Sequence, residues 1–148
     1  KYVIAGKGSE FENLKLKIKN LRLESKIVFL SNLIEKELIN LYQNAELFIL
    51  LPQDDNKDME GFGLVFLEAA ACGLPVVSAK DTSAEDAVLD GKNGILVQGQ
   101  DVSDAAEAIA KILSDKILHD SFSKESLFFA QKMSWHKTAS EYIEVYRV

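Results

Sequence analysis

Short apolar runs alternate with amphipathic segments of helical spacing along most of this chain. The expected strands are residues 2–6, 26–30, 47–52, 75–79 and 94–97. They are continuous apolar runs, which is typical of strands buried on both faces of a parallel sheet. Helical segments between such strands supply the crossover connections that parallel pairing needs. The chain is therefore predicted to be a doubly wound, Rossmann-like α/β domain.

The helical segments are expected at residues 11–23, 35–45, from 64 onward, and at 84–89. The chain after Asp101 is expected to be wholly helical, in three segments: residues 104–115, a segment through Met133, and residues 134–148. Asp101 and Ser134 are predicted N-caps in this C-terminal part. Trp135 is expected to anchor the last helix in the core. His119 and His136 are expected to be surface or packing residues rather than catalytic bases.

Composition narrows the class of partner. The chain has 148 residues and a formal net charge of −6, with no basic run, which argues against nucleic acid. No apolar stretch reaches the roughly 18 residues of a membrane span. A single cysteine, Cys72, excludes an intramolecular disulfide and is expected to be a small core residue. Because the chain enters an apolar strand almost at Lys1, we expect one domain that belongs to a longer protein.

The segment EGFGLVFLEAAACGLPVV, residues 60–77, combines glycines, an apolar helix and a single charge. In open parallel sheets, ligands bind where strands lead into helices, and a helix N-terminus favours phosphate. Glu68 lies inside the apolar helix, where a carboxylate without a partner is costly. It either clasps a ribose in the same crevice or reaches a polar rim beside a lysine such as Lys80.

Two further loops have candidate chemistry. Gly6 and Gly8 follow the first strand, and they either line a nucleotide crevice or only end the strand. Asp54, Asp55 and Asp58 lie close together but lack the spacing of a calcium loop, so we interpret them as a solvated loop rather than as a metal site.

Residues 60–77 closely resemble the nucleotide-sugar signature of retaining glycosyltransferases of the GT-B fold, especially glycosyltransferase family 4 (glycosyl transferases group 1). Members carry two glutamates separated by seven residues, and Glu60 and Glu68 have that spacing. The resemblance extends from VIAGKG near the N-terminus to SWHKTASEYIEVYRV at the C-terminus. It implies that residues 1–148 are the C-terminal, donor-binding domain, without its first strand and without the N-terminal acceptor domain.

The resemblance also implies roles for single residues. Glu68 is expected to hold the ribose hydroxyls of the donor. Glu60 is expected to act in catalysis by contacting the donor sugar, although it could instead be a first-turn acid favoured by the helix dipole. Contacts to the donor sugar and its phosphates are expected from Glu60, Gly61, Phe62, Gly63, Leu64 and Val65. The residues expected to line the nucleobase crevice are Gly6, Gly8 and Leu33.

The reaction implied by the resemblance transfers a hexose from a UDP-, GDP- or ADP-sugar to an acceptor hydroxyl with retention, in polysaccharide, lipopolysaccharide or glycoconjugate synthesis. The acceptor would be a glycan or a lipid-linked sugar held by the N-terminal domain. No cofactor and no metal are implied. The expected location is cytoplasmic, and peripheral membrane association of the full-length protein stays open. So do two other classes, a nucleotide-sugar epimerase of GT-B architecture and a non-catalytic nucleotide-sugar binding module.

The chain departs from the family pattern at two turns. Ser31 and Asn32 stand where a glycine is usual after the second strand, and residues 81–83 replace glycines that are common before Glu85. The loop at residues 53–59 is also longer and more acidic than usual. These departures leave the preference for base and sugar open.

Overall fold

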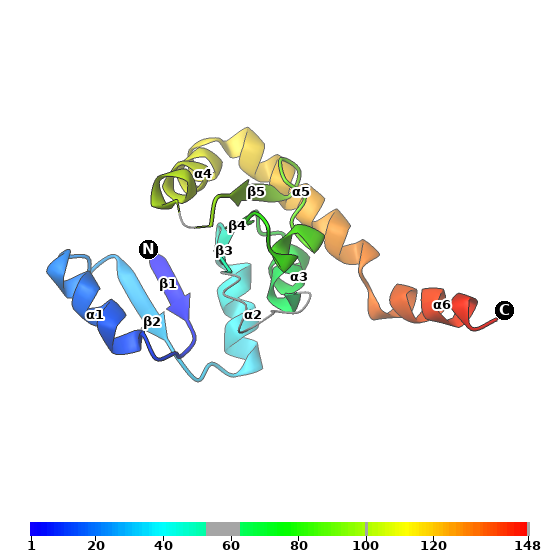
Figure 1. Ribbon diagram of the computed structural model, residues 1–148, viewed down its shortest axis with the longest axis horizontal. Coiled ribbons are helices and arrows are strands. Elements are labelled where there is room, and N and C mark those ends of the chain that lie inside the picture. The colour runs from blue at the N-terminus through cyan, green and yellow to red at the C-terminus, as the bar shows by residue number, and fades with distance from the viewer. Residues whose placement is uncertain (53–62, 100, 148) are drawn as a thin grey trace. The chain divides into compact units, whose positions relative to one another are not determined.

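The computed structural model describes residues 1–52, 63–99 and 101–147, which form two compact units, Lys1–Leu41 and Tyr42–Val148 (Figure 1). The described residues contain parallel strands that alternate with helices, as predicted. The elements are β1 (Tyr2–Ala5), α1 (Phe11–Asn20), β2 (Ile27–Leu30), α2 (Glu35–Gln43), β3 (Phe48–Ile49), α3 (Leu64–Ala71), β4 (Val76–Ala79), the 3₁₀-helix η1 (Ser83–Asp86), β5 (Gly94–Val97), α4 (Val102–Ser114), α5 (Lys116–Lys132) and α6 (Trp135–Val145).

In the first unit, β1 pairs in parallel with β2 along its whole length, and α1 connects the two strands. Ile18 of α1 is buried, and the ring of Phe11 lies 5.0 Å from that of Phe29 on β2. At the start of α2, the Glu37 carboxylate accepts a hydrogen bond of 3.0 Å from the N–H of Ile34. This contact is one half of a capping box, and it explains why the helix begins there.

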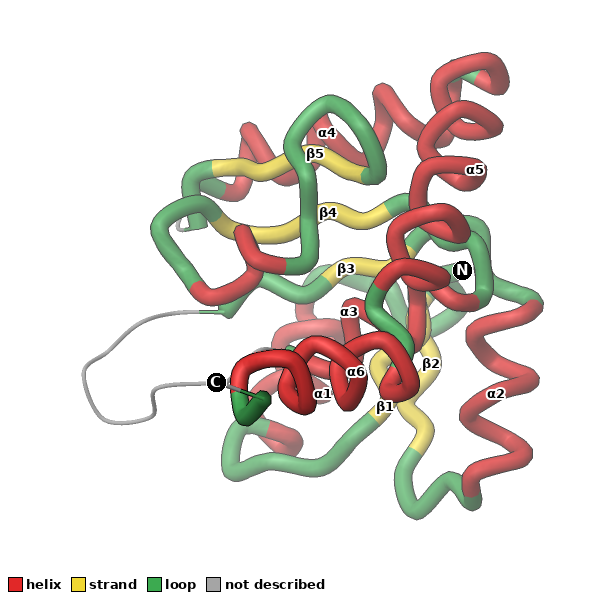
Figure 2. Tube along the Cα trace, turned by 90° about the vertical axis from the view of Figure 1, so that its right-hand side faces the viewer, coloured by secondary structure: helices red, strands yellow, loops and turns green. Residues whose placement is uncertain are grey.

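The second unit is built on a three-stranded parallel sheet in the order β3–β4–β5 (Figure 2). Successive side chains of a strand point to opposite faces, and in β4 Val76 belongs to one buried cluster and Val77 to the other. The first cluster includes Phe66 of α3 and Ala84 of η1, and the second includes Ile112 of α4. The sheet of this unit is therefore covered on both faces, as its continuous apolar strands predict.

The turn before β5 depends on two neighbouring residues. Asn93 is fully buried, and its side chain accepts a hydrogen bond from the Leu89 N–H at 2.7 Å and donates one to the Ala87 carbonyl at 3.1 Å. At Gly94, the carbonyl oxygen of Val76 occupies the place that a Cβ would take. Only glycine therefore allows β5 to approach β4 closely at this point.

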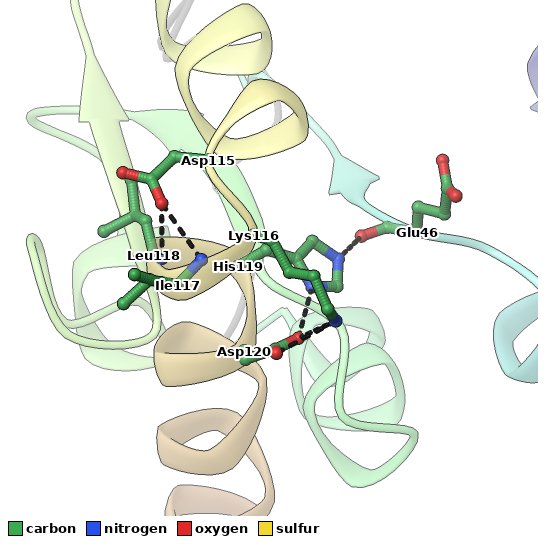
Figure 3. Close-up of polar contacts among 7 residues, drawn as sticks. All are labelled: Glu46, Asp115, Lys116, Ile117, Leu118, His119 and Asp120. Atoms are coloured by element: carbon green, nitrogen blue, oxygen red, sulfur yellow. Dashed lines mark hydrogen bonds and ion pairs between the residues drawn. The ribbon is translucent and has the colours of Figure 1, made fainter.

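Side-chain caps start the C-terminal helices. Asp101 accepts hydrogen bonds from two first-turn amides of α4, and Ser134 accepts one from α6, so both predicted N-caps are confirmed. Asp115 is a third cap that the sequence reading missed, and it separates α4 from α5 (Figure 3). Its Oδ1 accepts from the amides of Ile117 and Leu118, both at 3.0 Å.

His119 connects α5 to the segment that precedes β3 (Figure 3). Its Nε2 donates a hydrogen bond of 2.8 Å to the backbone carbonyl of Glu46. Beside it, Lys116 pairs with Asp120 at 3.0 Å, and this hydrogen bond holds the pKa of the Asp120 carboxyl below its usual value. The packing role predicted for His119 is confirmed.

The prediction that Trp135 anchors the last helix in the core is wrong. Its side chain is 80% exposed, and none of the residues described in α6 is buried. Four more large apolar side chains near it are exposed, namely Tyr142, Ile143, Val145 and Tyr146.

Candidate functional site

The start of α3 is shaped by Gly63. This residue is the N-cap, with a left-handed backbone at φ 66° and ψ 60° that side chains rarely adopt. A Cβ at this position would also lie 2.7 Å from Cδ2 of Phe66, whose ring is buried. Both the conformation and the space therefore require glycine at this position. The contact of Gly63 with the donor stays a prediction.

The first turn of α3 carries backbone amides that no described side chain caps. The first amides of a helix have no acceptor inside the helix, and α3 has neither a side-chain cap nor an acidic residue in its first turn. Leu64 and Val65 are exposed at 56% and 36%. The positive end of the helix dipole and these amides favour an anion such as phosphate. The contact of Leu64 and Val65 with a phosphate stays a prediction.

Glu68 lies about one turn further along α3, and its side chain is exposed. The carboxylate thus reaches the surface of a largely apolar helix. Its Oε2 accepts a hydrogen bond of 3.1 Å from the hydroxyl of Tyr42. None of the ion pairs among the described residues includes Glu68, so the alternative pairing with Lys80 is wrong.

Tyr42 lies at the end of α2 and is not among the residues predicted for the site. The structure buries its ring in a row of three aromatic side chains. Its ring centroid lies 5.8 Å from that of Phe48 on β3, and Phe48 lies 5.7 Å from Phe66 in an edge-to-face arrangement. Because Phe66 is also the residue against which Gly63 packs, the row connects Tyr42 with the start of α3.

Burial and the Glu68 carboxylate together raise the pKa values of two neighbouring groups, Tyr42 and Cys72. The pKa of Tyr42 is raised well above its ordinary value of 10.0, first by burial and then by its hydrogen bond to the Glu68 carboxylate. Burial, and then the charge of Glu68, also raises the pKa of the Cys72 thiol. Cys72 is half-buried at the end of α3 and is therefore held as a neutral thiol rather than a reactive thiolate.

The first unit contains the residues expected to line the base crevice. Gly6 continues the β1–β2 pairing, since its N–H donates to the Leu30 carbonyl at 2.9 Å, and its φ of 143° favours glycine. A Cβ at Gly6 or Gly8 would meet no atom within 4 Å. Leu33 is half-buried. Gly6 directly follows the last residue of β1, so the alternative in which it ends the strand is confirmed. The role of Gly6, Gly8 and Leu33 in base binding stays a prediction.

The two turns that depart from the family pattern keep a left-handed backbone. Asn32 has φ 58°, and so does Asp81. Asparagine and aspartate are the side chains that adopt this conformation most readily after glycine. The N–H of Asp81 also donates to the Glu85 carboxylate at 2.8 Å. Both turns therefore have a backbone that suits glycine, with a polar side chain in its place.

Several predicted residues lie outside the described part of the chain, namely Glu60, Gly61, Phe62, Asp54, Asp55 and Asp58. Elsewhere, within residues 1–52, 63–99 and 101–147, no three His, Cys, Asp or Glu side chains come together as metal ligands would. In the same ranges, no helix combines the length and the hydropathy of a membrane span.

Comparison with known proteins gives relatives across most of the chain. The family described as glycosyl transferases group 1 matches residues 1–127. The D-inositol 3-phosphate glycosyltransferase of Corynebacterium jeikeium is 35% identical over 139 residues, which cover 94% of this chain and 32% of that protein. A GDP-mannose-dependent alpha-(1-6)-phosphatidylinositol monomannoside mannosyltransferase of Mycolicibacterium smegmatis is 35% identical over 114 residues, covering 76% and 30%. The chain thus spans about a third of the length of these curated relatives.

Solved structures agree on the fold. Sucrose-phosphate synthase from Thermosynechococcus elongatus is 25% identical, with a TM-score of 0.81 over 98% of this chain and 37% of that one. HepE of Anabaena in complex with UDP-glucose is 25% identical, with a TM-score of 0.77 over 88% and 35%. The chain therefore belongs to the glycosyl transferases group 1, the family-4-like glycosyltransferases of the GT-B fold.

Proposed function

We propose that this chain is the donor-binding half of a retaining glycosyltransferase that moves a hexose from a nucleoside diphosphate sugar to an acceptor hydroxyl. The observation that carries the proposal is the start of α3, where a helix N-terminus without a cap from any described side chain is followed, about one turn later, by the exposed Glu68 carboxylate. A phosphate acceptor for the amides and a hydroxyl donor for the carboxylate are both present in a nucleoside diphosphate. The acceptor, a glycan or a lipid-linked sugar, would bind to another domain of the full-length protein.

The relatives support a nucleotide-sugar donor but differ in its base. One relative is named as GDP-mannose-dependent, and one structural neighbour holds UDP-glucose. Asn32 and Asp81 stand at turns where the family usually has glycine. Because of these departures, the choice among UDP, GDP and ADP is not carried over from the relatives and has to be measured on this chain.

In the proposed mechanism, the first-turn amides of α3 stabilise the negative charge that develops on the leaving diphosphate. Glu68 accepts hydrogen bonds from the ribose diol and so fixes the nucleotide along the helix. Glu60, one residue before the glycine loop, would contact the donor hexose. The acceptor would attack on the face that the diphosphate leaves, and a phosphate oxygen would take its proton, so this half supplies no general base.

The first test is a thermal-stabilisation screen of the chain with UDP-, GDP- and ADP-sugars. A ligand that binds only the folded state raises the melting temperature, so one base should give a clear concentration-dependent shift. Glu68→Ala should lose most of that shift. The matched control is Glu125→Ala, which removes an exposed glutamate from α5 and should behave as wild type. A full shift in Glu68→Ala would overturn the site.

The second test is product analysis of the full-length protein with a radiolabelled donor. Transfer of the sugar with retained anomeric configuration is the expected outcome. Isomerisation of the unreacted donor would instead indicate an epimerase. Tight binding without any product would indicate a non-catalytic module.

A further inference from the structure

We propose that Tyr42 is a positioning residue for donor binding, whose hydroxyl holds one oxygen of Glu68 so that the other oxygen faces the ribose. This inference rests on the proposed function, because it assigns Glu68 to the ribose. It adds a residue from a different helix, 26 positions earlier in the chain.

The hydrogen bond between Tyr42 and Glu68 involves one of the two carboxylate oxygens. The Tyr42 hydroxyl reaches Oε2 of Glu68 at 3.1 Å, and no described residue donates to Oε1. A carboxylate has about four acceptor positions, and one of them is occupied by Tyr42. Among the described residues none occupies the remaining positions, and on an exposed side chain they can accept hydrogen bonds from hydroxyl groups of a ligand.

Tyr42, which donates this hydrogen bond, is held in place by the side chains around it. Tyr42 is only 9% exposed, and its ring packs against Phe48, which packs in turn against Phe66. Phe66 precedes Glu68 by two residues on the same helix. The aromatic row therefore orients the phenol relative to α3.

Such a contact improves binding by pre-organisation. An exposed glutamate samples many rotamers, and a ligand that needs one of them loses affinity by ordering the side chain. Tyr42 limits that freedom before the nucleotide arrives. The phenol stays a hydrogen-bond donor at neutral pH, as its ordinary pKa of 10.0 already ensures, and burial and then Glu68 raise that pKa further.

A purely structural role for Tyr42 predicts something different. In that case the hydroxyl only satisfies its own hydrogen bond, and its removal changes stability but not the preference for ribose. The measurement that distinguishes the two roles is the ratio of two affinities, that for a ribonucleotide and that for its 2′-deoxy form. Both affinities are measured on one preparation of each variant, so the fraction of folded protein cancels from this ratio.

The experiment measures binding of UDP, GDP and ADP, and of their 2′-deoxy forms, to this chain by calorimetry. The variants are Tyr42→Phe, Glu68→Ala and the double substitution, with Tyr146→Phe as a control because Tyr146 is 81% exposed. We expect Tyr42→Phe to lower the ribose preference by roughly three- to tenfold. In the Glu68→Ala background it should have no further effect, since the two side chains act as one unit.

The outcomes distinguish this inference from the proposed function. If Tyr42→Phe keeps the full ribose preference while Glu68→Ala loses it, the positioning role is wrong and the donor site stands. An equal loss from Tyr42→Phe with and without Glu68 would also overturn it, because the hydroxyl would then act independently. If Glu68→Ala keeps the preference, or if wild type binds none of the nucleotides, the proposed site fails and the positioning role fails with it.

Discussion

At the scale of single residues, the described part of the candidate site depends on two side-chain contacts. Gly63 leaves the space that the Phe66 ring fills, and Tyr42 gives the Glu68 carboxylate a donor inside the protein. A glutamate in an apolar helix is thus accommodated by two conditions at once, an exposed position and a fixed hydroxyl partner.

Gly63→Ala should destabilise the protein more than an ordinary glycine substitution in the same conformation. The left-handed backbone costs about 1–2 kcal/mol for a residue with a Cβ, and the overlap with the buried Phe66 ring adds about 1–3 kcal/mol. Gly91→Ala is the matched control, because Gly91 has φ 72° but no atom within 4 Å of a Cβ. Urea unfolding measures both losses, and equal values would show that the Phe66 contact is relieved without cost.

Tyr42 should make the protein sensitive to alkali. Its pKa in the folded state lies above the ordinary 10.0, so the unfolded chain loses the phenol proton first. The stability linked to this group is fully present below pH 10.0 and declines as the pH rises from there toward the folded pKa. Urea unfolding at increasing pH should therefore show a steeper loss in wild type than in Tyr42→Phe.

The exposed Tyr146 serves as the comparison for that experiment. Tyr146→Phe is the matched control, because it also removes a tyrosine hydroxyl, but from a side chain that is 81% exposed. Identical alkaline slopes for wild type and Tyr42→Phe would contradict the assignment of this sensitivity to Tyr42.

At the scale of elements, the helices after β5 begin where an acidic or hydroxyl side chain meets free amides. The predicted caps Asp101 and Ser134 stand before clear changes in pattern, and this is why the sequence reveals them. Asp115 stands at the end of one predicted helical segment, and its role as the cap of the next helix was seen only in the structure.

Asp115→Ala should lower the free energy of unfolding by about 1 kcal/mol, because the amides of Ile117 and Leu118 lose their shared acceptor. Asp115→Asn should cost much less, since asparagine caps a helix about as well as aspartate. Chemical denaturation of the two variants tests this expectation. A loss in Asp115→Asn as large as in Asp115→Ala would mean that charge, rather than the acceptor oxygen, is what matters.

Other boundaries moved for physical reasons. The third strand was expected at residues 47–52 and is paired only at Phe48–Ile49, because pairing depends on the partner strand and not on apolar character alone. The helix expected at residues 84–89 is a short 3₁₀-helix, Ser83–Asp86, started by the Thr82 side chain. Local composition therefore located both elements but not their lengths.

At the scale of the whole chain, the α/β class and the family were predictable, because alternating apolar runs and a long motif are local features of the sequence. The contact between Tyr42 and Glu68 was not, since it joins residues 26 positions apart that only folding brings together. Trp135 was misassigned because large aromatic residues are usually buried, while α6 leaves this one in water.

The exposed Trp135 also decides how this protein can be followed by fluorescence. It is the only tryptophan in the chain, and its indole is already 80% exposed in the folded state. Unfolding should therefore change its emission little, and a flat signal during a denaturant titration would not mean that the protein resists denaturation. A shift of the Trp135 emission to shorter wavelengths would instead show that another surface has covered α6. The fluorescence of this indole therefore reports association rather than unfolding.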